Sequence, residues 1–387
     1  MSNHVVAPAV CDASDPTSSV AVPASEREGR TPSVLKRVAI HNRVVHRVRD
    51  FLRREGYVEI PVPELTPATG SCEVVDSMFS MDYFGLLAFP RQTGQLYLEE
   101  MVAGGLSAVY CEGESLRKEW KLDDRHLTEF KLIEIEKRDM TLDELCDFEE
   151  RLLKDAASGL TSEDVGDAGE ERLCRMLSAE HPRIAYREAV AILNRRGFDL
   201  RFGDDLGHRE EAALVDYAGG LPVHVTHFPE GIKFFNMKVC RADPAVVECV
   251  DYILPFSGET FGGALREPDV EILRRRLHTG TMYSHLMNRA AESARVRMLV
   301  GRDGHHVAGG DPGAAEAAPT VEDLTCRYQR AVEDAFERYL SLFEAVPTER
   351  AGFGLGVARL IQSFMGLPSI KQAVIFPMDR ASFGALG

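Results

Sequence analysis

Apolar residues near the start of the chain recur at the spacing of a helix. Between residues 38 and 52 they fall three or four positions apart, with Ser33 as a candidate N-cap and Gly56 as a candidate stop. This pattern predicts one amphipathic helix. Its opposite face is rich in arginine, which is typical of a solvated surface and less often of contact with tRNA or an acidic partner.

Strand patterns follow in the middle of the chain. Ala108 to Tyr110 form an apolar run, and residues 132–136 alternate apolar and acidic side chains, so two strands are expected. The segment 221–239 also favours a core strand, with Lys233 directed outward. Further helices are expected at 141–160, within 181–200 after a short strand, and at 324–342.

Two stretches lack any such period. Residues 1–32 are rich in Ala, Pro, Ser and Val, which predicts a disordered tail, and residues 301–320 resemble a low-complexity, disordered insertion. The ordered part is therefore expected to be one domain, residues 33–387, interrupted by that insertion.

The composition favours a sizeable core and no membrane span. Of 387 residues, 44% are hydrophobic, but no run approaches the ~20 apolar residues of a span, and no secretory pattern opens the chain. We therefore expect a cytoplasmic protein without a membrane partner. Its eight cysteines are scattered, which favours reduced thiols over a zinc site or disulfides. The net charge of −16 is a poor match to nucleic acid, so tRNA is not the expected partner, although a local patch would allow it.

A charged loop lies between the two expected strands of the middle region. Guanidinium groups bind phosphate oxygens, and an aromatic ring offers a face to a base, so this loop suggests a nucleotide site. The alternative is a solvated hairpin with surface ion pairs. The loop residues concerned are Arg117, Glu119, Arg125, His126, Glu129 and Phe130.

The loop is similar to a motif of a known family. R-x-E followed by R-H-L-x-E-F resembles motif 2 of class II aminoacyl-tRNA synthetases, in the aspartyl/asparaginyl subgroup, closest to its asparaginyl members. Segments 56–66 and 352–377 resemble motifs 1 and 3, and 250–267 resembles the D-x7-E and G-G-x-x-R-E signature between them. The resemblance implies an α+β fold with an antiparallel sheet flanked by helices, and a homodimer formed through the 34–66 helix and strand.

The same resemblance implies an ATP site with Mg²⁺. Arg117 would neutralise the α-phosphate, while His126 and Arg359 would meet the β,γ end, and Phe130 would stack on adenine. Arg117, Arg359 and Glu259 are the expected catalytic residues. The wider ATP-binding set adds Glu119, Arg125, His126 and Phe130, and the metal ligands are Asp251 and Glu259.

An amino-acid pocket is implied beside it. Its expected residues are Glu73, Gln95, Glu99, Glu134 and Arg266. Leu98 stands where aspartyl enzymes place a Lys, and Glu99 follows it. At ~4 Å and an effective dielectric of about 20, a free Glu99 would repel a substrate carboxylate by about 4 kcal/mol. The sequence therefore favours a carboxamide or an ammonium at this position.

Several positions depart from the family pattern. Val74 and Val75 follow Glu73 where small residues are usual, and Ala358 replaces an acidic residue before Arg359. Glu349 and Arg350 occupy the places of a Pro-His pair, so this wall of the amino-acid pocket differs and the substrate is expected to differ as well.

The expected reaction is ATP-dependent, AMP-forming activation of aspartate or an asparagine-like acid. The short segment before residue 33 leaves no room for the family's anticodon-binding domain, which favours amide formation without tRNA, as in asparagine-synthetase-like relatives. In that reading, aspartate binds reversed, with its α-carboxylate on Arg266 and its ammonium on Glu99. The alternatives are tRNA aminoacylation or transfer to a small amine, and a non-catalytic dimeric regulator.

Overall fold

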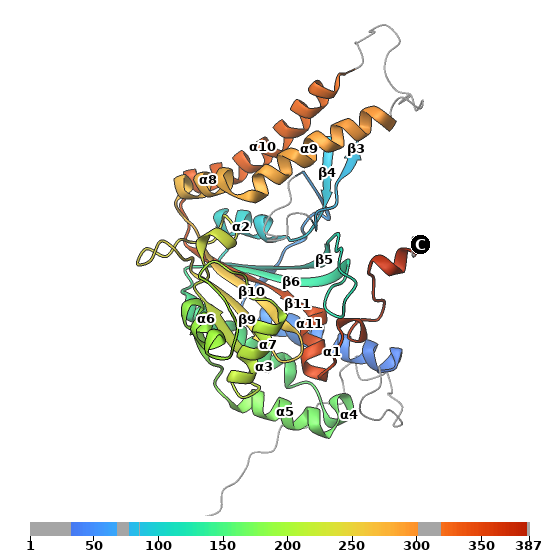
Figure 1. Cartoon of the computed structure of the whole chain (residues 1–387), viewed down its shortest axis with the longest axis vertical. Helices are drawn as coiled ribbons and strands as arrows, with labels where there is room; N and C mark the ends of the chain where they lie inside the picture. The colour runs from blue at the N-terminus through green and yellow to red at the C-terminus, as the bar shows by residue number, and fades with distance from the viewer. Residues whose placement is uncertain (1–31, 68–76, 85, 301–318, 385–387) are drawn as a thin grey trace, which may run out of the picture.

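One large sheet organises the part of the chain that the computed structural model describes, namely residues 32–67, 77–84, 86–300 and 319–384 (Figure 1). Its strands lie in the order β1-β5-β6-β11-β10-β9-β8-β7. The β1–β5 and β7–β8 pairs are parallel and the other pairs are antiparallel. The strands are β1 (Val58–Glu59), β5 (Ala108–Leu116), β6 (Glu129–Arg138), β7 (Arg183–Ala185), β8 (Val223–Thr226), β9 (Cys249–Leu254), β10 (Gly258–Arg266) and β11 (Arg350–Gly356).

Four helices pack against one face of this sheet, over strands β5, β6, β9, β10 and β11. Alternate strand residues such as Ile133, Ile135 and Phe353 point to this face and pack with α1, α3, α5 and α11 in one apolar core. Ser33 caps α1 by accepting the Lys36 N–H, as expected. These helices are α1 (Val34–Arg54), α3 (Leu142–Ala157), α5 (Asp167–Ser178), which follows the short α4 (Ser162–Val165), and α11 (Val357–Met365).

The other face of the sheet is covered only towards its edges. At one side α2 packs on β5 through Leu98, Val102, Val109 and Cys111. At the other side α6 and α7 pack on β8 and β9 in a separate apolar cluster. The central strands β6, β11 and β10 lie between these two covers. The covering helices are α2 (Gln95–Ala103), α6 (Tyr186–Arg195) and α7 (His208–Tyr217).

A helical arm projects beyond the sheet (Figure 1). It consists of α8 (Val270–Thr279), α9 (Thr281–Val300) and α10 (Val321–Ala345), which share an apolar cluster with a small sheet. That sheet has the order β2-β4-β3 and comprises β2 (Leu65–Thr66), β3 (Met81–Tyr83) and β4 (Leu86–Pro90). Short 3₁₀ turns complete the fold at η3 (Glu230–Ile232), η5 (Ile370–Gln372) and η6 (Arg380–Phe383).

The α+β fold with a mostly antiparallel sheet is thus confirmed, as are the first helix and the two strands around the charged loop. The expectation for 221–239 is wrong: β8 ends at Thr226, and η3 and irregular chain follow, so Lys233 points inward to Asp251 rather than outward. The tail 1–32 falls almost wholly outside the described residues, as does most of the insertion 301–320. None of the described helices combines the length and apolar character needed to cross a bilayer.

Candidate active site

Small residues line the uncovered middle of the sheet. In β11, Gly352 and Gly354 share a face with Arg350, because alternate residues of a strand point the same way. Across the strand pairs they lie opposite Glu136 and Glu134 of β6 on one side. On the other side they lie opposite Ala264 and Gly262 of β10. We call this surface, floored by Gly352, Gly354, Gly262 and Ala264, the trough.

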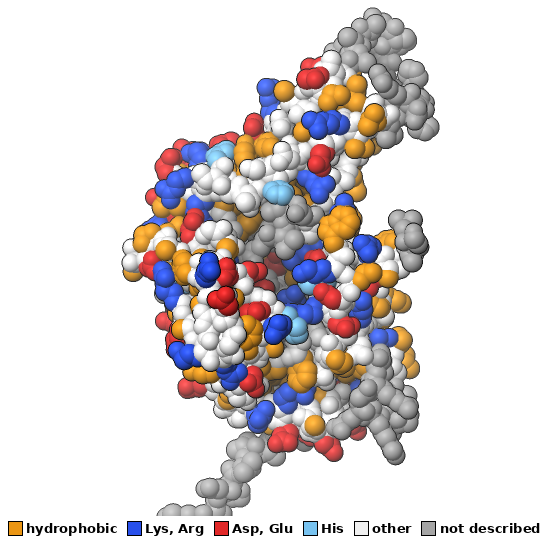
Figure 2. Space-filling view, viewed as in Figure 1, with side chains coloured by type: hydrophobic (Ala, Val, Ile, Leu, Met, Phe, Trp, Pro, Cys, Tyr) orange, Lys and Arg blue, Asp and Glu red, His pale blue; other side chains and the backbone are white. Residues whose placement is uncertain are grey.

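Side chains beside the trough leave little room for a Cβ atom at one of its glycines. A Cβ added to Gly352 would lie 2.0 Å from Glu136 Oε2 and 2.2 Å from the Ile135 carbonyl oxygen. A Cβ on Gly354 would be 3.8 Å from its nearest neighbour, Glu134 Cγ. The packing of the protein therefore requires glycine at position 352, whereas the space over Gly354 is open. Charged side chains of both signs gather at the middle of the face seen in Figure 2.

Arg117 and Phe130 lie together at the base of the loop that joins β5 and β6. The guanidinium carbon of Arg117 is 5.0 Å from the centroid of the Phe130 ring. The Arg117 N–H donates to the Thr128 carbonyl at 2.8 Å, which closes the loop. Phe130 shares the trough face of β6 with Glu134 by alternation. This end of the trough thus offers an aromatic face beside a fixed positive charge.

Arg359 adds a second positive charge in the first turn of α11, where the sequence had led us to expect it. Its Nη1 donates to the Glu259 carbonyl and lies 3.9 Å from Glu259 Oε2. Burial lowers the pKa of Arg359, although the Glu259 and Glu211 carboxylates act in the opposite direction. Since an arginine remains protonated near neutral pH, Arg359 can meet an anion here.

Other residues of the charged loop are engaged by protein partners. Arg125 Nη2 donates to Glu211 Oε2 of α7 at 2.8 Å, and burial raises the pKa of that carboxyl group. His126 Nδ1 lies 2.8 Å from Asp123. The Glu119 N–H donates to the Arg117 carbonyl at 2.9 Å. The ATP contacts expected of Arg125, His126 and Glu119 therefore stay predictions.

The two expected metal ligands lie on neighbouring strands but have different surroundings. Glu259 Oε1 lies 2.8 Å from the Cβ position of Gly262, which is the cross-strand partner of Asp251. Both oxygens of Asp251 accept from Lys233 Nζ, at 2.9 and 3.1 Å. The half-buried carboxylate of Glu259 suits a hard cation such as Mg²⁺. Asp251 fits that role only when Lys233 moves away, so the metal pair stays a prediction.

At the opposite end of the trough, two carboxylates of β6 meet the start of α2. Glu134 accepts the Gly94 N–H at 2.7 Å and the Thr93 hydroxyl. Glu136 Oε2 accepts from Gln95 Nε2 and from Arg266 Nε, the latter at 3.3 Å. Burial raises the pKa of Glu136 to about 8, although the Arg266 guanidinium opposes this shift. The two acidic residues of the alternating pattern are therefore buried beneath α2.

Glu99 lies deepest at this end and is completely buried. Its partners come from three distant parts of the chain: Arg350 of β11, Tyr339 of α10, and Asn236. The sequence predicts a Glu99 free to act on the substrate, because nothing in the local pattern indicates these partners. Arg350 had been noticed only as a departure from the family pattern.

The structure thus divides the expected site residues between two ends of one surface. Glu73 alone lies outside the described residues. What the sequence did not reveal is the partner of each group. Glu99 meets Arg350, Asp251 meets Lys233 and Arg125 meets Glu211. The first end holds Arg117, Phe130, Arg359 and Glu259, and the second holds Gln95, Glu99, Glu134 and Arg266.

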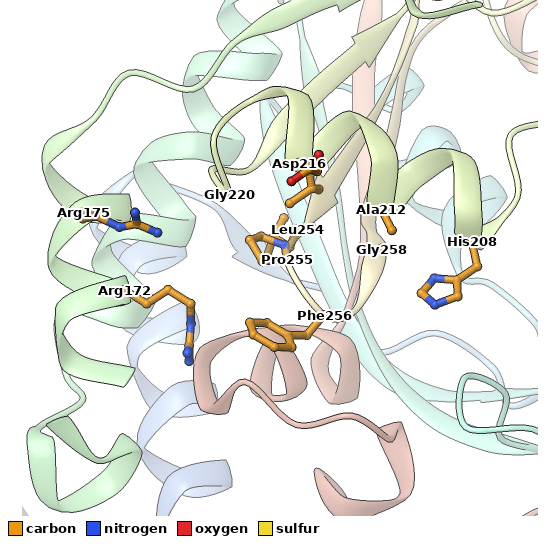
Figure 3. Close-up of a pocket in the computed structure, with 11 residues that line it drawn as sticks. Arg172, Arg175, His208, Ala212, Asp216, Gly220, Leu254, Pro255, Phe256 and Gly258 are labelled. Carbon is orange, nitrogen blue, oxygen red and sulfur yellow. The ribbon is translucent and has the colours of Figure 1, made fainter. Parts of the chain in front are cut away.

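A separate cavity of about 350 Å³ lies between α5 and α7, beside the turn that precedes Glu259 (Figure 3). Phe256 stands at its wall with a φ of 69°, which is rare for a bulky residue, and its ring centroid is 5.0 Å from the Arg172 guanidinium carbon. No sequence pattern indicated this cavity, because its walls come from two helices and a turn.

Comparison with known proteins identifies the family. The chain matches the model for tRNA synthetases class II (D, K and N) over residues 26–294 and 317–380. It is 30% identical over 359 residues to asparagine–tRNA ligase of Pelotomaculum thermopropionicum, covering 90% of this chain and 70% of that protein. The corresponding protein of Pyrococcus furiosus is also 30% identical, over 91% of this chain and 70% of its own length.

Solved structures agree with this assignment. The asparaginyl-tRNA synthetase of Pyrococcus horikoshii complexed with asparaginyl-adenylate aligns with a TM-score of 0.68 and 27% identity, over 90% of this chain and 69% of that one. The chain therefore belongs to the class II tRNA synthetases of the D, K and N group, a family of ATP-dependent ligases. Because the relatives are named as tRNA ligases, they favour the aminoacylation alternative over amide formation without tRNA, and they do not support the expectation that tRNA is an unlikely partner.

Proposed function

We propose that this chain activates the α-carboxylate of aspartate or an asparagine-like amino acid with ATP and transfers the aminoacyl group to tRNA. The observation that carries the proposal is the trough. It has phosphate- and base-binding chemistry at one end, amino-acid-binding chemistry at the other, and a glycine floor between them.

At the first end, the reaction needs positive charge and positioning. A carboxylate oxygen of the amino acid attacks the α-phosphorus, the bond to the leaving pyrophosphate breaks, and an aminoacyl-adenylate remains. Arg117 and Arg359 stabilise the negative charge that develops on the phosphate oxygens, while Phe130 stacks on adenine. Mg²⁺ held by Glu259 would supply further neutralisation of the phosphates. The protein's contribution is mainly geometry and electrostatics.

At the second end, the amino acid is held by fixed polar groups. Gln95 lies at the start of α2, and its amide donates to Glu136. This position supports a role for the Gln95 amide in binding the amino group of the substrate. Arg266 reaches the same position from β10 and provides a cation for the substrate side chain. Glu134 is tied to Thr93 and Gly94, so it anchors the start of α2 and thereby Gln95.

The choice of acceptor rests on the relatives and on the state of Glu99. The reversed pose for amide formation requires Glu99 to receive the substrate ammonium. Glu99 instead accepts from Arg350, Tyr339 and Asn236, which removes the group on which that pose depends. The similarity to asparagine–tRNA ligases over about 90% of the chain supports tRNA as the acceptor.

The deciding experiment measures pyrophosphate and AMP formation with a panel of amino acids, with and without ammonium and total tRNA. We expect amino-acid-dependent ATP–pyrophosphate exchange without ammonium, and aminoacyl-tRNA when tRNA is added. Arg359→Ala should abolish the exchange, whereas Arg330→Ala, an exposed arginine of α10, should leave it unchanged. Turnover that requires ammonium would instead establish an amide ligase. Absence of AMP with every amino acid would refute adenylation.

A further inference from the structure

The carboxylate of Glu99 accepts hydrogen bonds from three side chains of the protein. Oε2 accepts from the Tyr339 hydroxyl at 2.7 Å and from both Nε and Nη2 of Arg350, the first at 2.9 Å. Oε1 accepts from Asn236 Nδ2 at 2.6 Å. Three of these donors lie on Oε2, whereas Oε1 has one hydrogen-bond donor and lies 3.9 Å from Arg266 Nε. Because two of the four donors belong to the Arg350 guanidinium, the negative charge of Glu99 is offset mainly by Arg350.

Arg350 is held just as tightly. Its Nη1 donates to the Thr348 carbonyl at 2.9 Å, and its guanidinium carbon is 3.6 Å from the centroid of the Phe343 ring. The side chain has no exposed surface. Arg350 therefore does not reach the trough itself. It acts through Glu99 by cancelling the negative charge that would otherwise face the substrate.

Arg266 is the cation that remains available at this end. Its Nε donates to Glu136 Oε2 at 3.3 Å. Across the described ranges of the chain, the two Nη groups of Arg266 have no hydrogen-bond partner. Two parallel N–H donors of a guanidinium match the two oxygens of a carboxylate, which makes this fork suited to an anionic side chain.

The surroundings of Glu136 also favour a substrate with an anionic side chain. Its Oε2 already accepts from Gln95 and Arg266, and its Oε1 has no hydrogen-bond partner among the described residues. Burial raises the pKa of Glu136 to about 8, so the neutral form of this carboxyl group is favoured near neutral pH. Arg350 offsets the charge of Glu99 and burial disfavours a charge on Glu136, so Arg266 keeps positive charge for a substrate.

We propose that Arg350 makes this pocket selective for an amino acid with an anionic side chain, such as aspartate, over the corresponding carboxamide. Arg266 binds the side-chain carboxylate, and Arg350 is a positioning residue that acts through Glu99. The inference rests on the proposed function and deepens it by naming the substrate class. It reverses the preference that the sequence suggested for a free Glu99.

The first test is equilibrium binding of L-aspartate and L-asparagine by calorimetry, without ATP, so that it does not depend on turnover. The unchanged protein should bind aspartate at least tenfold more tightly. Arg350→His should lower that ratio at least tenfold, because Glu99 is then left uncompensated opposite the substrate. Arg330→Ala should leave the ratio unchanged.

The double variant Glu99→Gln/Arg350→Gln separates charge from shape, and it avoids burying an unpaired charge if Arg350→His fails to fold. The two neutral amides preserve the net charge of the pocket, so the aspartate preference should remain. Tighter binding of asparagine by the unchanged protein, an unaltered ratio in Arg350→His, or a lost preference in the double variant would overturn the inference.

The proposed function is tested separately. Preferential aspartate binding without pyrophosphate release would defeat adenylation while leaving the selectivity intact. Asparagine-dependent exchange without an aspartate preference would defeat the selectivity while leaving adenylation intact.

Discussion

A pair of glycine substitutions tests whether substrates lie on the trough. In Gly354→Ala, the new methyl group stands about 1.5 Å above the floor and has its nearest protein neighbour, Glu134 Cγ, at 3.8 Å. The protein itself therefore accommodates it. A substrate lying across the central strands does not, because the methyl group occupies the surface that the substrate would contact.

Gly354→Ala should impair substrate binding without loss of stability, whereas Gly352→Ala should lower stability. Gly354→Ala should keep or slightly raise stability, since alanine in a strand interior gains about 0.5–1 kcal/mol over glycine, mainly through the unfolded chain. Its KM for ATP or amino acid should rise at least tenfold, which corresponds to about 1.4 kcal/mol of lost binding. Gly352→Ala forces Cβ to 2.2 Å from the Ile135 carbonyl oxygen, so the strands must shift. It should cost about 1–3 kcal/mol or more in stability.

Thermal unfolding and pyrophosphate exchange, measured on both variants, separate these effects. Gly231→Ala is the matched control, because no atom lies within 4 Å of its Cβ position, and it should keep or slightly raise stability and leave the exchange activity unchanged. Full exchange activity in Gly354→Ala, at unchanged KM, would refute the assignment of the trough as the substrate surface. Unchanged stability in Gly352→Ala would refute the close packing on which the argument rests.

Three further predictions follow from particular contacts. Phe130→Ala should raise the KM for ATP about 5- to 150-fold, as expected for losing about 1–3 kcal/mol of stacking, with the amino-acid KM unchanged. Phe130→Leu keeps an apolar side chain against the cluster of Leu127, Ala358 and Ile370, and it should show most of the same loss if stacking is the cause. Lys233→Met should destabilise the fold by about 3–5 kcal/mol in urea unfolding, because Asp251 loses its buried partner, and Lys233→Met/Asp251→Asn should recover most of it. If the double variant is no more stable than Lys233→Met, the ion pair is not the cause. The pKa of Glu136 is raised to about 8 in the folded chain, so between about pH 4.5 and 8 the folded chain keeps a proton that the unfolded chain has lost, and stability falls as pH rises. Glu136→Gln should reduce this slope by up to about 1.4 kcal/mol per pH unit. If urea unfolding at pH 5.5 and 7.5 gives the same slope for the variant as for the unchanged protein, the assignment is contradicted.

Local patterns in the sequence determined the backbone and the two ends of the site. The helical spacing after Ser33 and the strands flanking the charged loop depend on neighbours within a few residues, and they were predicted correctly. Arg117 and Arg359 could be predicted as site residues because each stands in a short motif whose backbone conformation is set locally. The α+β fold followed from the order of those motifs.

Only the tertiary structure decided which charges meet. Glu99 and Arg350 are 251 positions apart, and they pair because α2 packs beside the first residue of β11, where Arg350 lies opposite Arg266 of β10. Lys233 turns inward because the chain leaves the strand after Thr226, which the apolar pattern of 221–239 does not reveal. The sign of the field at the amino-acid end depends on such pairings, because a buried charge is offset only by the neighbours that strand register and helix packing place beside it.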